Sequence, residues 1–342
     1  MFMLKWWLDL SSLTITFPYY DTDLAPFYSR FWATLAHFDG VHYLRLADHG
    51  YADWGSQAFF PLYPLLISLF TKIIGDPLYS GVIISLVSLI LAIIALRRLF
   101  PTRPKLFLLV LSFPTAFFFF TLYTESLFFA LSLWFFVTLR EKRYWFAAIL
   151  AGLASSTRLV GAFLAVSLFI ELLHQPLSLI RRLVLILLSL SGLLLYMFYL
   201  YLAVGDPLLF FHVQPVFGAG RSGGELILLP QVIYRYGKIF LTTSSQTFLF
   251  WRALIEFIIF SWATSTLVLK FKKMPLSISS YLALSLLLPT LTGTLSSLPR
   301  YILVLTPWIL PQTRRGIWIY LIICLPLALL CVIQFVRGIF VS

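Results

Sequence analysis

Long apolar runs dominate this sequence, and short clusters of basic residues separate them. An apolar run of about 20 residues is long enough to cross the hydrocarbon core of a bilayer as a helix. Because backbone polar groups inside a bilayer must be bonded within the chain, helices are the favoured way to span it. We therefore expect an all-α, polytopic integral membrane protein. Runs of this kind lie at residues 79–96, 183–204, 247–269, 276–296 and 316–336.

The composition excludes an ordinary water-soluble globule. Of the 342 residues, 61% are hydrophobic and 11% are charged, whereas a soluble domain is roughly half apolar and about a quarter charged. A net charge of +12 would suggest nucleic acid as a partner of a soluble protein. Here the basic residues lie between apolar runs, as in the cytoplasmic loops of membrane proteins, so no nucleic-acid partner is expected. These clusters are Arg97–Arg98 with Arg103 and Lys105, Arg140 with Lys142 and Arg143, Arg181–Arg182, Lys270 with Lys272 and Lys273, and Arg314–Arg315.

With the basic clusters in the cytoplasm, the sequence predicts a single domain of about nine to eleven transmembrane helices. The expected bundle covers residues 79–342 and contains a Gly-rich outer loop at 205–225. A large first extracytoplasmic loop is expected at 18–78. The first span, at residues 2–17, is weak because Lys5 and Asp9 interrupt it.

Three segments need more than one short helix or an unusual placement. Residues 106–139 and 144–174 each lie between two basic clusters, so each should cross the membrane twice. Their expected turns are near Tyr123–Glu125 and Ser155–Arg158. Residues 58–74 are predicted to form a helix in the outer interface, with an ordinary span as the open alternative.

Polar side chains are concentrated at residues 37–57 of the first loop. On a helix, Asp39, His42 and His49 share one face, because they are spaced by three and seven positions. Ionisable groups in an apolar chain are candidates for function, so this polar island suggests acid/base chemistry at a membrane surface. A solvated outer loop is the plain alternative. A divalent metal site made by Asp39, His42 and His49 also stays open, although seven helical positions separate the two histidines.

Several stretches resemble the PIG-V family of mannosyltransferases, which belongs to the GT-C superfamily of multi-spanning glycosyltransferases. The family's eukaryotic members resemble GPI mannosyltransferase 2, and this chain looks like a prokaryotic relative. The resemblance covers about residues 25–310; its first motif is long and specific, and its last is weak. The motifs are FDGVHYLRLADHGY (Phe38–Tyr51), AFFPLYPLL (Ala58–Leu66), FPTAFFFFTLYTESLFFAL (Phe113–Leu131), AGLASSTRLVGAFL (Ala151–Leu164) and LPRYILVLTPW (Leu298–Trp308).

The resemblance implies a glycosyltransferase that takes a sugar, expected to be mannose, from a polyprenyl-phosphate donor. The acceptor would be a hydroxyl of a lipid, glycan or protein, and the sugar carbon would invert. The active site would lie on the extracytoplasmic face, of the plasma membrane if the protein is prokaryotic. Asp39 matches the family's acidic residue in the first outer loop and would act as the base. No cofactor is expected beyond the metal alternative above.

The substrate-binding candidates are polar residues placed in apolar surroundings. Arg158 and Arg300, the latter beside Tyr301, are candidates to hold the donor phosphate, with a snorkelling residue and an interfacial anchor as their structural alternatives. Glu125 is a candidate to bind a substrate hydroxyl; the alternative is that Glu125 is itself a solvated turn residue. His42 and His49 complete the set. Of the outer-loop residues, Arg221 is expected to be solvated, and His212 and Gln214 are weaker candidates for sugar contacts.

A transporter or lipid flippase is the rival function. It would also use polar residues inside the membrane and broken helices. It would not require acids and histidines to be concentrated in one outer loop.

Overall fold

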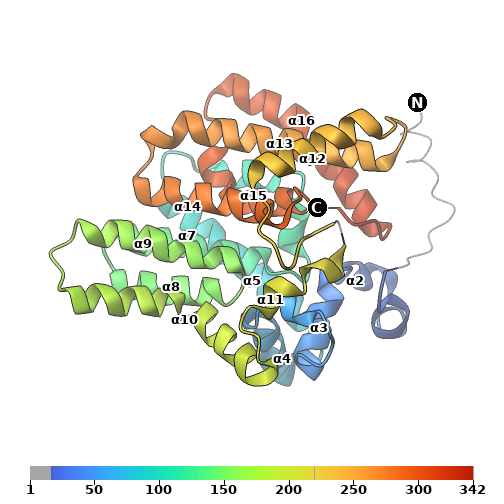
Figure 1. The fold of residues 1–342 in the computed structure, drawn as a ribbon, viewed down its shortest axis with the longest axis horizontal. Coiled ribbons are helices and arrows are strands. Elements are labelled where there is room, and N and C mark those ends of the chain that lie inside the picture. Colours follow the sequence, from blue (N-terminus) through green and yellow to red (C-terminus); the bar gives the residue numbers. More distant parts are fainter. Residues whose placement is uncertain (1–16, 219, 342) are drawn as a thin grey trace.

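The computed structural model describes residues 17–218 and 220–341, and all regular structure within these residues is helical (Figure 1). The all-α prediction is therefore confirmed for this part of the chain. The weak first span expected at residues 2–17 lies almost entirely outside the described residues.

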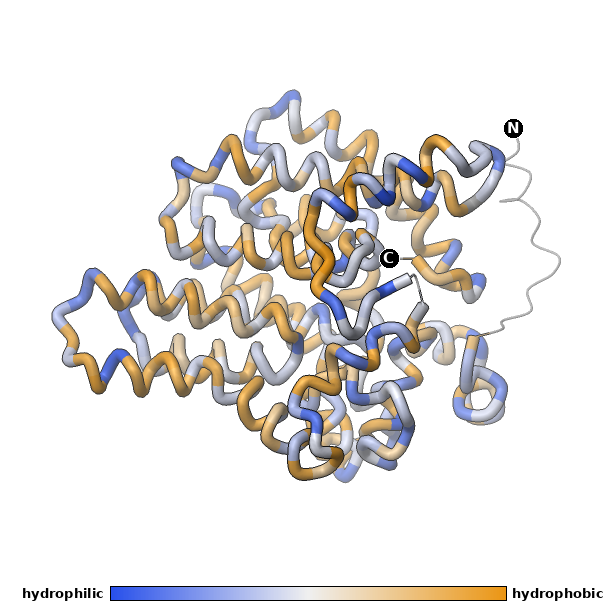
Figure 2. The backbone as a smooth tube through the Cα atoms, in the orientation of Figure 1, coloured by the Kyte–Doolittle hydropathy of each residue, from blue (hydrophilic) through white to orange (hydrophobic). Residues whose placement is uncertain are grey.

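In the part of the chain that the structure describes, four helices are long and apolar enough to cross a membrane. Large apolar side chains on them face outward; Leu195, Phe198 and Leu202 of α10, for example, are 67%, 58% and 68% exposed. Figure 2 shows that apolar residues extend along most of the bundle. Exposed apolar surface of this extent suits lipid rather than water, and it indicates a membrane protein. The four helices are α5 (Pro77–Leu99), α10 (Leu179–Val204), α13 (Phe248–Lys270) and α16 (Arg314–Val336).

The remaining helices are shorter, so the expected number of nine to eleven spans stays a prediction. The break predicted near Ser155–Arg158 is confirmed, because α8 ends at Ser155 and Arg158 has an extended backbone. The turn predicted near Tyr123–Glu125 is also present, and α7 begins at Glu125. The shorter helices of the bundle are α6 (Leu106–Leu111), η3 (Ala116–Phe120), α7 (Glu125–Arg140), α8 (Tyr144–Ser155), η4 (Leu159–Ala162), α9 (Phe163–Leu173), α14 (Leu276–Leu287), η6 (Phe271–Lys273), η7 (Leu288–Thr292) and α15 (Leu298–Ile309).

The segment before α5 folds as a group of short helices at the bottom of Figure 1. Residues 39–49 of the polar island form α3, and the residue that follows it, Gly50, has a positive φ of 65°; glycine adopts this conformation without steric cost. Residues 58–74 are helical from Leu62, as expected, and the interfacial position of this helix stays a prediction. The helices are η1 (Tyr20–Leu24), α2 (Arg30–Thr34), α3 (Asp39–His49), η2 (Ser56–Ala58) and α4 (Leu62–Ile74).

The segment after α10 also carries short helices. They are α11 (Leu209–His212) and η5 (Gln214–Phe217), followed by α12 (Leu229–Thr242). Backbone bonds attach the intervening loop to η7: Ser222 donates to the Thr292 carbonyl (2.9 Å) and Ile227 to that of Leu291 (3.0 Å). The Gly-rich loop is thus packed against the bundle.

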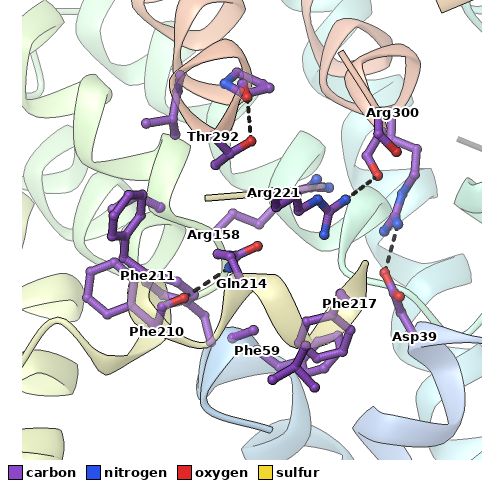
Figure 3. A pocket seen from close by; sticks show the side chains of 18 of the residues that line it. Asp39, Phe59, Arg158, Phe210, Phe211, Gln214, Phe217, Arg221, Thr292 and Arg300 are labelled. Atoms are coloured by element: carbon purple, nitrogen blue, oxygen red, sulfur yellow. Dashed lines mark hydrogen bonds and ion pairs between the residues drawn. The ribbon is translucent and has the colours of Figure 1, made fainter. Parts of the chain in front are cut away.

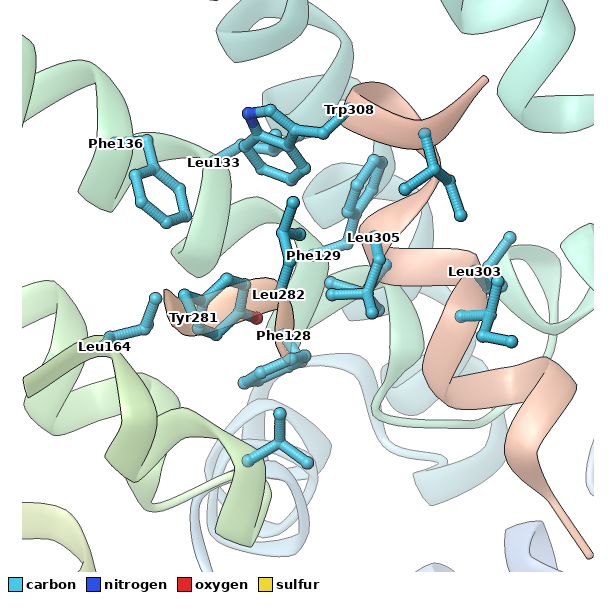
Figure 4. Packing of buried hydrophobic residues seen from close by; sticks show 14 of the residues in the cluster. Phe128, Phe129, Leu133, Phe136, Leu164, Tyr281, Leu282, Leu303, Leu305 and Trp308 are labelled. Atoms are coloured by element: carbon cyan, nitrogen blue, oxygen red, sulfur yellow. The ribbon is translucent and has the colours of Figure 1, made fainter. Parts of the chain in front are cut away.

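Two kinds of packing fix the positions of the helices. Aromatic and aliphatic side chains of α7, α14 and α15 interlock in the core, with Phe136 stacking edge-on against Tyr281 and Trp308 (Figure 4). In contrast, α8 and α10 touch through their backbones, since a Cβ atom on Gly192 would lie 2.1 Å from the Gly152 carbonyl oxygen. Small residues allow such close approach between helices in lipid. The end of α8, where Arg158 follows, is therefore held against α10.

Candidate active site

A cavity of about 1050 Å³ is lined by residues of α3, α10, α11, α13 and α15 and of the loops between them (Figure 3). Part of its wall is apolar and aromatic, and another part is cationic. Pockets that combine an apolar wall with a few convergent polar groups are typical binding sites. The apolar wall includes Phe59, Phe60, Leu193, Met197, Phe210 and Phe211, and the charged lining residues are Asp39, Arg158, Arg221, Arg252 and Arg300.

Four charged side chains from distant parts of the sequence form a continuous charge chain: Asp39, Arg300, Glu125 and Arg158. Arg300 Nη1 donates to Asp39 Oδ2 (2.7 Å), and Arg300 Nε and Nη2 lie 2.8 and 2.7 Å from Glu125 Oε1. Arg158 Nη1 lies 2.9 Å from the same Glu125 oxygen. Two cations and two anions alternate, so the chain is neutral as a whole. Such compensation is what allows charges to be buried.

Local structure explains where the two carboxylates of the charge chain stand. Asp39 and Glu125 are each the first residue of a helix, α3 and α7. Free backbone N–H groups and the helix dipole favour negative charge at a helix N-terminus. Of the two arginines, Arg158 is the extended residue between α8 and η4, and Arg300 lies in the first turn of α15.

Aromatic rings surround the guanidinium groups of the charge chain. Arg300 lies 4.7 Å from the Phe118 ring and 4.9 Å from the Tyr123 ring. Arg158 lies 4.7 Å from the ring of Tyr301. These distances are in the range of cation–π attraction. Tyr301, predicted to bind substrate, packs against Arg158 and also lines the cavity.

Asp39 is the member of the charge chain that offers a carboxylate oxygen to the cavity. Its side chain is 22% exposed, and among the described residues only Oδ2 has a hydrogen-bond donor, which is Arg300. Burial opposes ionisation of Asp39, but the charge and hydrogen bond of Arg300 outweigh it and hold the pKa of this carboxyl below its usual range. Asp39 is thus ionised, with Oδ1 available to a ligand.

The histidines predicted to accompany Asp39 have different positions. His42 lines the cavity and stacks on Phe59, with ring centroids 5.1 Å apart; burial lowers its pKa, which favours the neutral ring. His49 is not among the cavity residues, and its exposed side chain lies 3.3 Å from Asp48. Asp39, His42 and His49 therefore do not form a common ligand set. Within residues 17–218 and 220–341, no three His, Cys, Asp or Glu side chains are grouped as metal ligands.

The rest of the polar island has a structural role that its sequence did not indicate. Arg45 Nη1 pairs with Asp23 Oδ2 (2.6 Å), and Arg45 Nε pairs with Asp53 Oδ2 (2.7 Å). The guanidinium also lies 4.1 Å from the ring of Tyr19. These contacts tie the end of the island to the segment before it. Arg45 therefore bonds both carboxylate oxygens of Asp53, whereas Arg300 bonds only Oδ2 of Asp39.

Two arginines of the cavity were not foreseen. Arg221, expected to be solvated, is partly buried and donates from Nη2 to Ser297 Oγ (2.9 Å). Arg252 of α13 donates to Ser296 Oγ and lies 3.0 Å from Glu256 Oε1. The spacing of Arg252 and Glu256 by four residues inside an apolar run was the available signal.

The two weaker candidates from the outer loop also line the cavity. Gln214 donates to the carbonyl of Phe210 (2.9 Å), and His212 pairs with Asp206 (2.6 Å). The site thus combines an ionised carboxylate, a group of arginines and an apolar wall, which together suit an amphipathic anion. Comparisons of the chain with models of protein families, with curated proteins and with solved structures find no match.

Proposed function

We propose that this protein is an integral membrane glycosyltransferase that moves a sugar, mannose by the family resemblance, from a polyprenyl-phosphate donor to a hydroxyl. The observation that carries the proposal is the position of Asp39. Its free carboxylate oxygen faces a cavity of about 1050 Å³ that also contains arginines and an apolar wall. A lipid-linked sugar phosphate needs these three environments together.

The chemistry assigned to Asp39 is general-base catalysis. As the acceptor oxygen forms its bond to the anomeric carbon, Asp39 Oδ1 takes the hydroxyl proton, and the bond from that carbon to the phosphate oxygen breaks. The phosphate leaves with the electron pair, and the sugar carbon inverts. A carboxylate with a low pKa is a weak base, so the proton moves late, when the acceptor oxygen has become acidic through bonding to carbon.

The cationic lining supports departure of the phosphate. Negative charge grows on the phosphate oxygens during cleavage, and fixed cations in a site shielded from water stabilise that charge strongly. The Arg158 guanidinium makes no hydrogen bond within the described residues and contacts Glu125 only as an ion pair. Its remaining N–H groups can therefore bind a ligand. Arg300 instead directs its donors to Asp39 and Glu125 and holds the base in place.

The proposed membrane arrangement follows from charge and hydropathy. The basic clusters would lie in the cytoplasm, which puts α3, α4 and the cavity at the opposite face. A donor with a long polyprenyl chain stays in lipid, so its phosphate is presented at that interface. The resemblance to the PIG-V family and the GT-C superfamily leads to the same arrangement, in the plasma membrane if the protein is prokaryotic.

Transfer of radiolabelled mannose from polyprenyl-phosphate-mannose tests the proposal. Membranes containing the protein should move label to an endogenous lipid, glycan or protein acceptor, and Asp39→Asn membranes should not. The reaction run with and without a chelator separates a metal-dependent transfer from one that needs no metal. Absence of label transfer from any polyprenyl-phosphate sugar to added membrane acceptors would refute the proposal.

A lipid transporter or flippase is the second candidate, because the apolar wall and arginines would also suit passage of a lipid phosphate. Such a protein would not need a free carboxylate beside the anion-binding groups. Movement of a fluorescent polyprenyl-phosphate between leaflets of proteoliposomes, without sugar transfer, would favour the transporter. Transfer abolished by Asp39→Asn would favour the enzyme.

A further inference from the structure

The arginines of the cavity differ in what balances their charge. Arg158 and Arg300 pair with Glu125 and Asp39, and Arg252 pairs with Glu256. Among the described residues, no carboxylate pairs with the remaining arginine of the cavity, Arg221. Three of the four lining arginines are balanced by three carboxylates, so one positive charge is left over. A partly buried cation without a counter-ion is costly unless an anion binds beside it.

The structure holds Arg221 firmly in this position. Ser297 accepts a hydrogen bond from its guanidinium and lies directly before α15, with a left-handed φ of 66° that is uncommon for serine. A strained residue at a cavity wall is often found at functional sites. Arg235 Nη1 in turn bonds the carbonyls of Gly220 (3.1 Å) and Gly293 (2.9 Å), which links the Arg221 loop to the segment before α15.

Arg221 is also close to the proposed base. Ser297, its partner, is three residues before Arg300, which bonds Asp39. The charge of Arg221 contributes, after Arg300 and His42, to lowering the pKa of Asp39. In Figure 3 the Arg221 side chain lies in the cavity between Arg158 and Arg300. An anion beside Arg221 would therefore be next to the carboxylate that deprotonates the acceptor.

We infer that Arg221, with the Ser297 hydroxyl, binds the single negative charge of a lipid phosphodiester, the leaving phosphate of the donor. The inference rests on the proposed function and assigns the ligand chemistry to a residue on the outer loop. The phosphodiester neutralises the one unbalanced charge of the cavity. After sugar transfer the phosphate is a monoester and carries more charge, so Arg221 contacts the group on which negative charge grows. The lipid chain then follows the apolar wall at Phe210 and Phe211.

Binding of polyprenyl phosphate to purified protein tests this inference without any sugar transfer. Arg221→Gln should weaken binding of polyprenyl phosphate by about tenfold to a hundredfold, the usual effect of losing a charged hydrogen bond. Binding of uncharged polyprenol should not change. Arg221→Lys, which keeps the charge but loses the planar fork, should give an intermediate loss and serves if the glutamine variant does not fold. Arg181→Gln, an exposed arginine at the start of α10, is the matched control and should bind as wild type does.

Three outcomes separate the inference from the proposed function. If Arg221→Gln binds polyprenyl phosphate as tightly as wild type, the inference is wrong, even if the protein transfers sugar. If wild-type binding depends on Arg221 but no sugar is transferred, Arg221 binds a lipid phosphate, and the transferase proposal fails together with the leaving-group role that rests on it. If inorganic phosphate binds at Arg221 as tightly as polyprenyl phosphate, the assignment to a lipid is wrong.

Discussion

Glu125 is the acceptor that two arginines share, so its replacement is the most direct test of the charge chain. Its side chain is fully buried, and its Oε1 atom lies within 2.7–2.9 Å of nitrogens of Arg300 and Arg158. Glu125→Gln preserves the shape of the side chain but removes its charge. Asp39 still balances one arginine, so one buried cation is left without a partner.

The expected loss of stability follows from that count. Breaking a buried ion pair by removing one partner costs about 3–5 kcal/mol. Since the amide oxygen can still accept one hydrogen bond, we expect a value near the lower end, about 3 kcal/mol. For a chain of this size such a loss corresponds to a fall in Tm of roughly 4 °C.

Thermal unfolding of the purified protein, followed by tryptophan fluorescence, measures this change. Glu141→Gln is the matched control: Glu141 is the C-cap of the same helix, is 40% exposed and has cation partners no closer than 3.7 Å. It should cost less than about 1 kcal/mol. Adding Arg158→Gln to Glu125→Gln should recover part of the loss, because the unpaired cation is removed. Equal Tm values for the Glu125 and Glu141 variants would refute the charge chain.

Four further expectations concern activity and topology. Asp39→Asn should lower turnover about a hundredfold or more while Asp48→Asn, which changes an exposed side chain, leaves it unchanged; the opposite ranking in a transfer assay would reassign the base. Because the folded pKa of Asp39 is lowered, it stays ionised as pH falls, so the acidic limb of a kcat/KM profile should lie below the usual aspartate value of about 4; a limb near neutral pH would contradict this. Arg158→Lys should reduce transfer at least tenfold with normal membrane insertion, and wild-type rates would remove Arg158 from the site. In a background without native cysteines, a membrane-impermeant thiol reagent should label Ala52→Cys from outside intact cells and Lys272→Cys only after lysis, with the reverse pattern overturning the topology.

The positions of the helices could be predicted because apolar runs and their interruptions are local features. The polar residues at Ser155–Arg158 predicted a break, and the structure ends α8 there. Residues 106–139 were harder: α6 has six residues and a 3₁₀ segment follows it. Pro114 lies between them, and its missing amide prevents a continuous helix. A run of apolar residues alone does not show this shortening.

The members of the site could be identified singly but not as a network. Glu125, Arg158 and Arg300 each stand out because ionisable residues are rare in apolar segments. The contact between Glu125 and Arg300 joins positions separated by 175 residues, and no local sequence pattern encodes such a contact. Arg221 was expected to be solvated because Gly-rich loops usually lie at the surface. Bonds from that loop to η7 bury it, and only the folded chain contains them. His49 shares a helix face with Asp39 in sequence, but the end of α3 extends beyond the cavity.

The charge chain also sets an order in which the site can assemble during synthesis. A growing chain folds from its N-terminus, so α7 and the residues that follow α8 are in place long before α15 exists. Glu125 and Arg158 can neutralise each other at that stage, and the early bundle buries no unpaired charge between them. Asp39 has no such partner until Arg300 is made. The proposed base is therefore the last member to be fixed, and a nascent chain that stops before α15 lacks the cation that holds it.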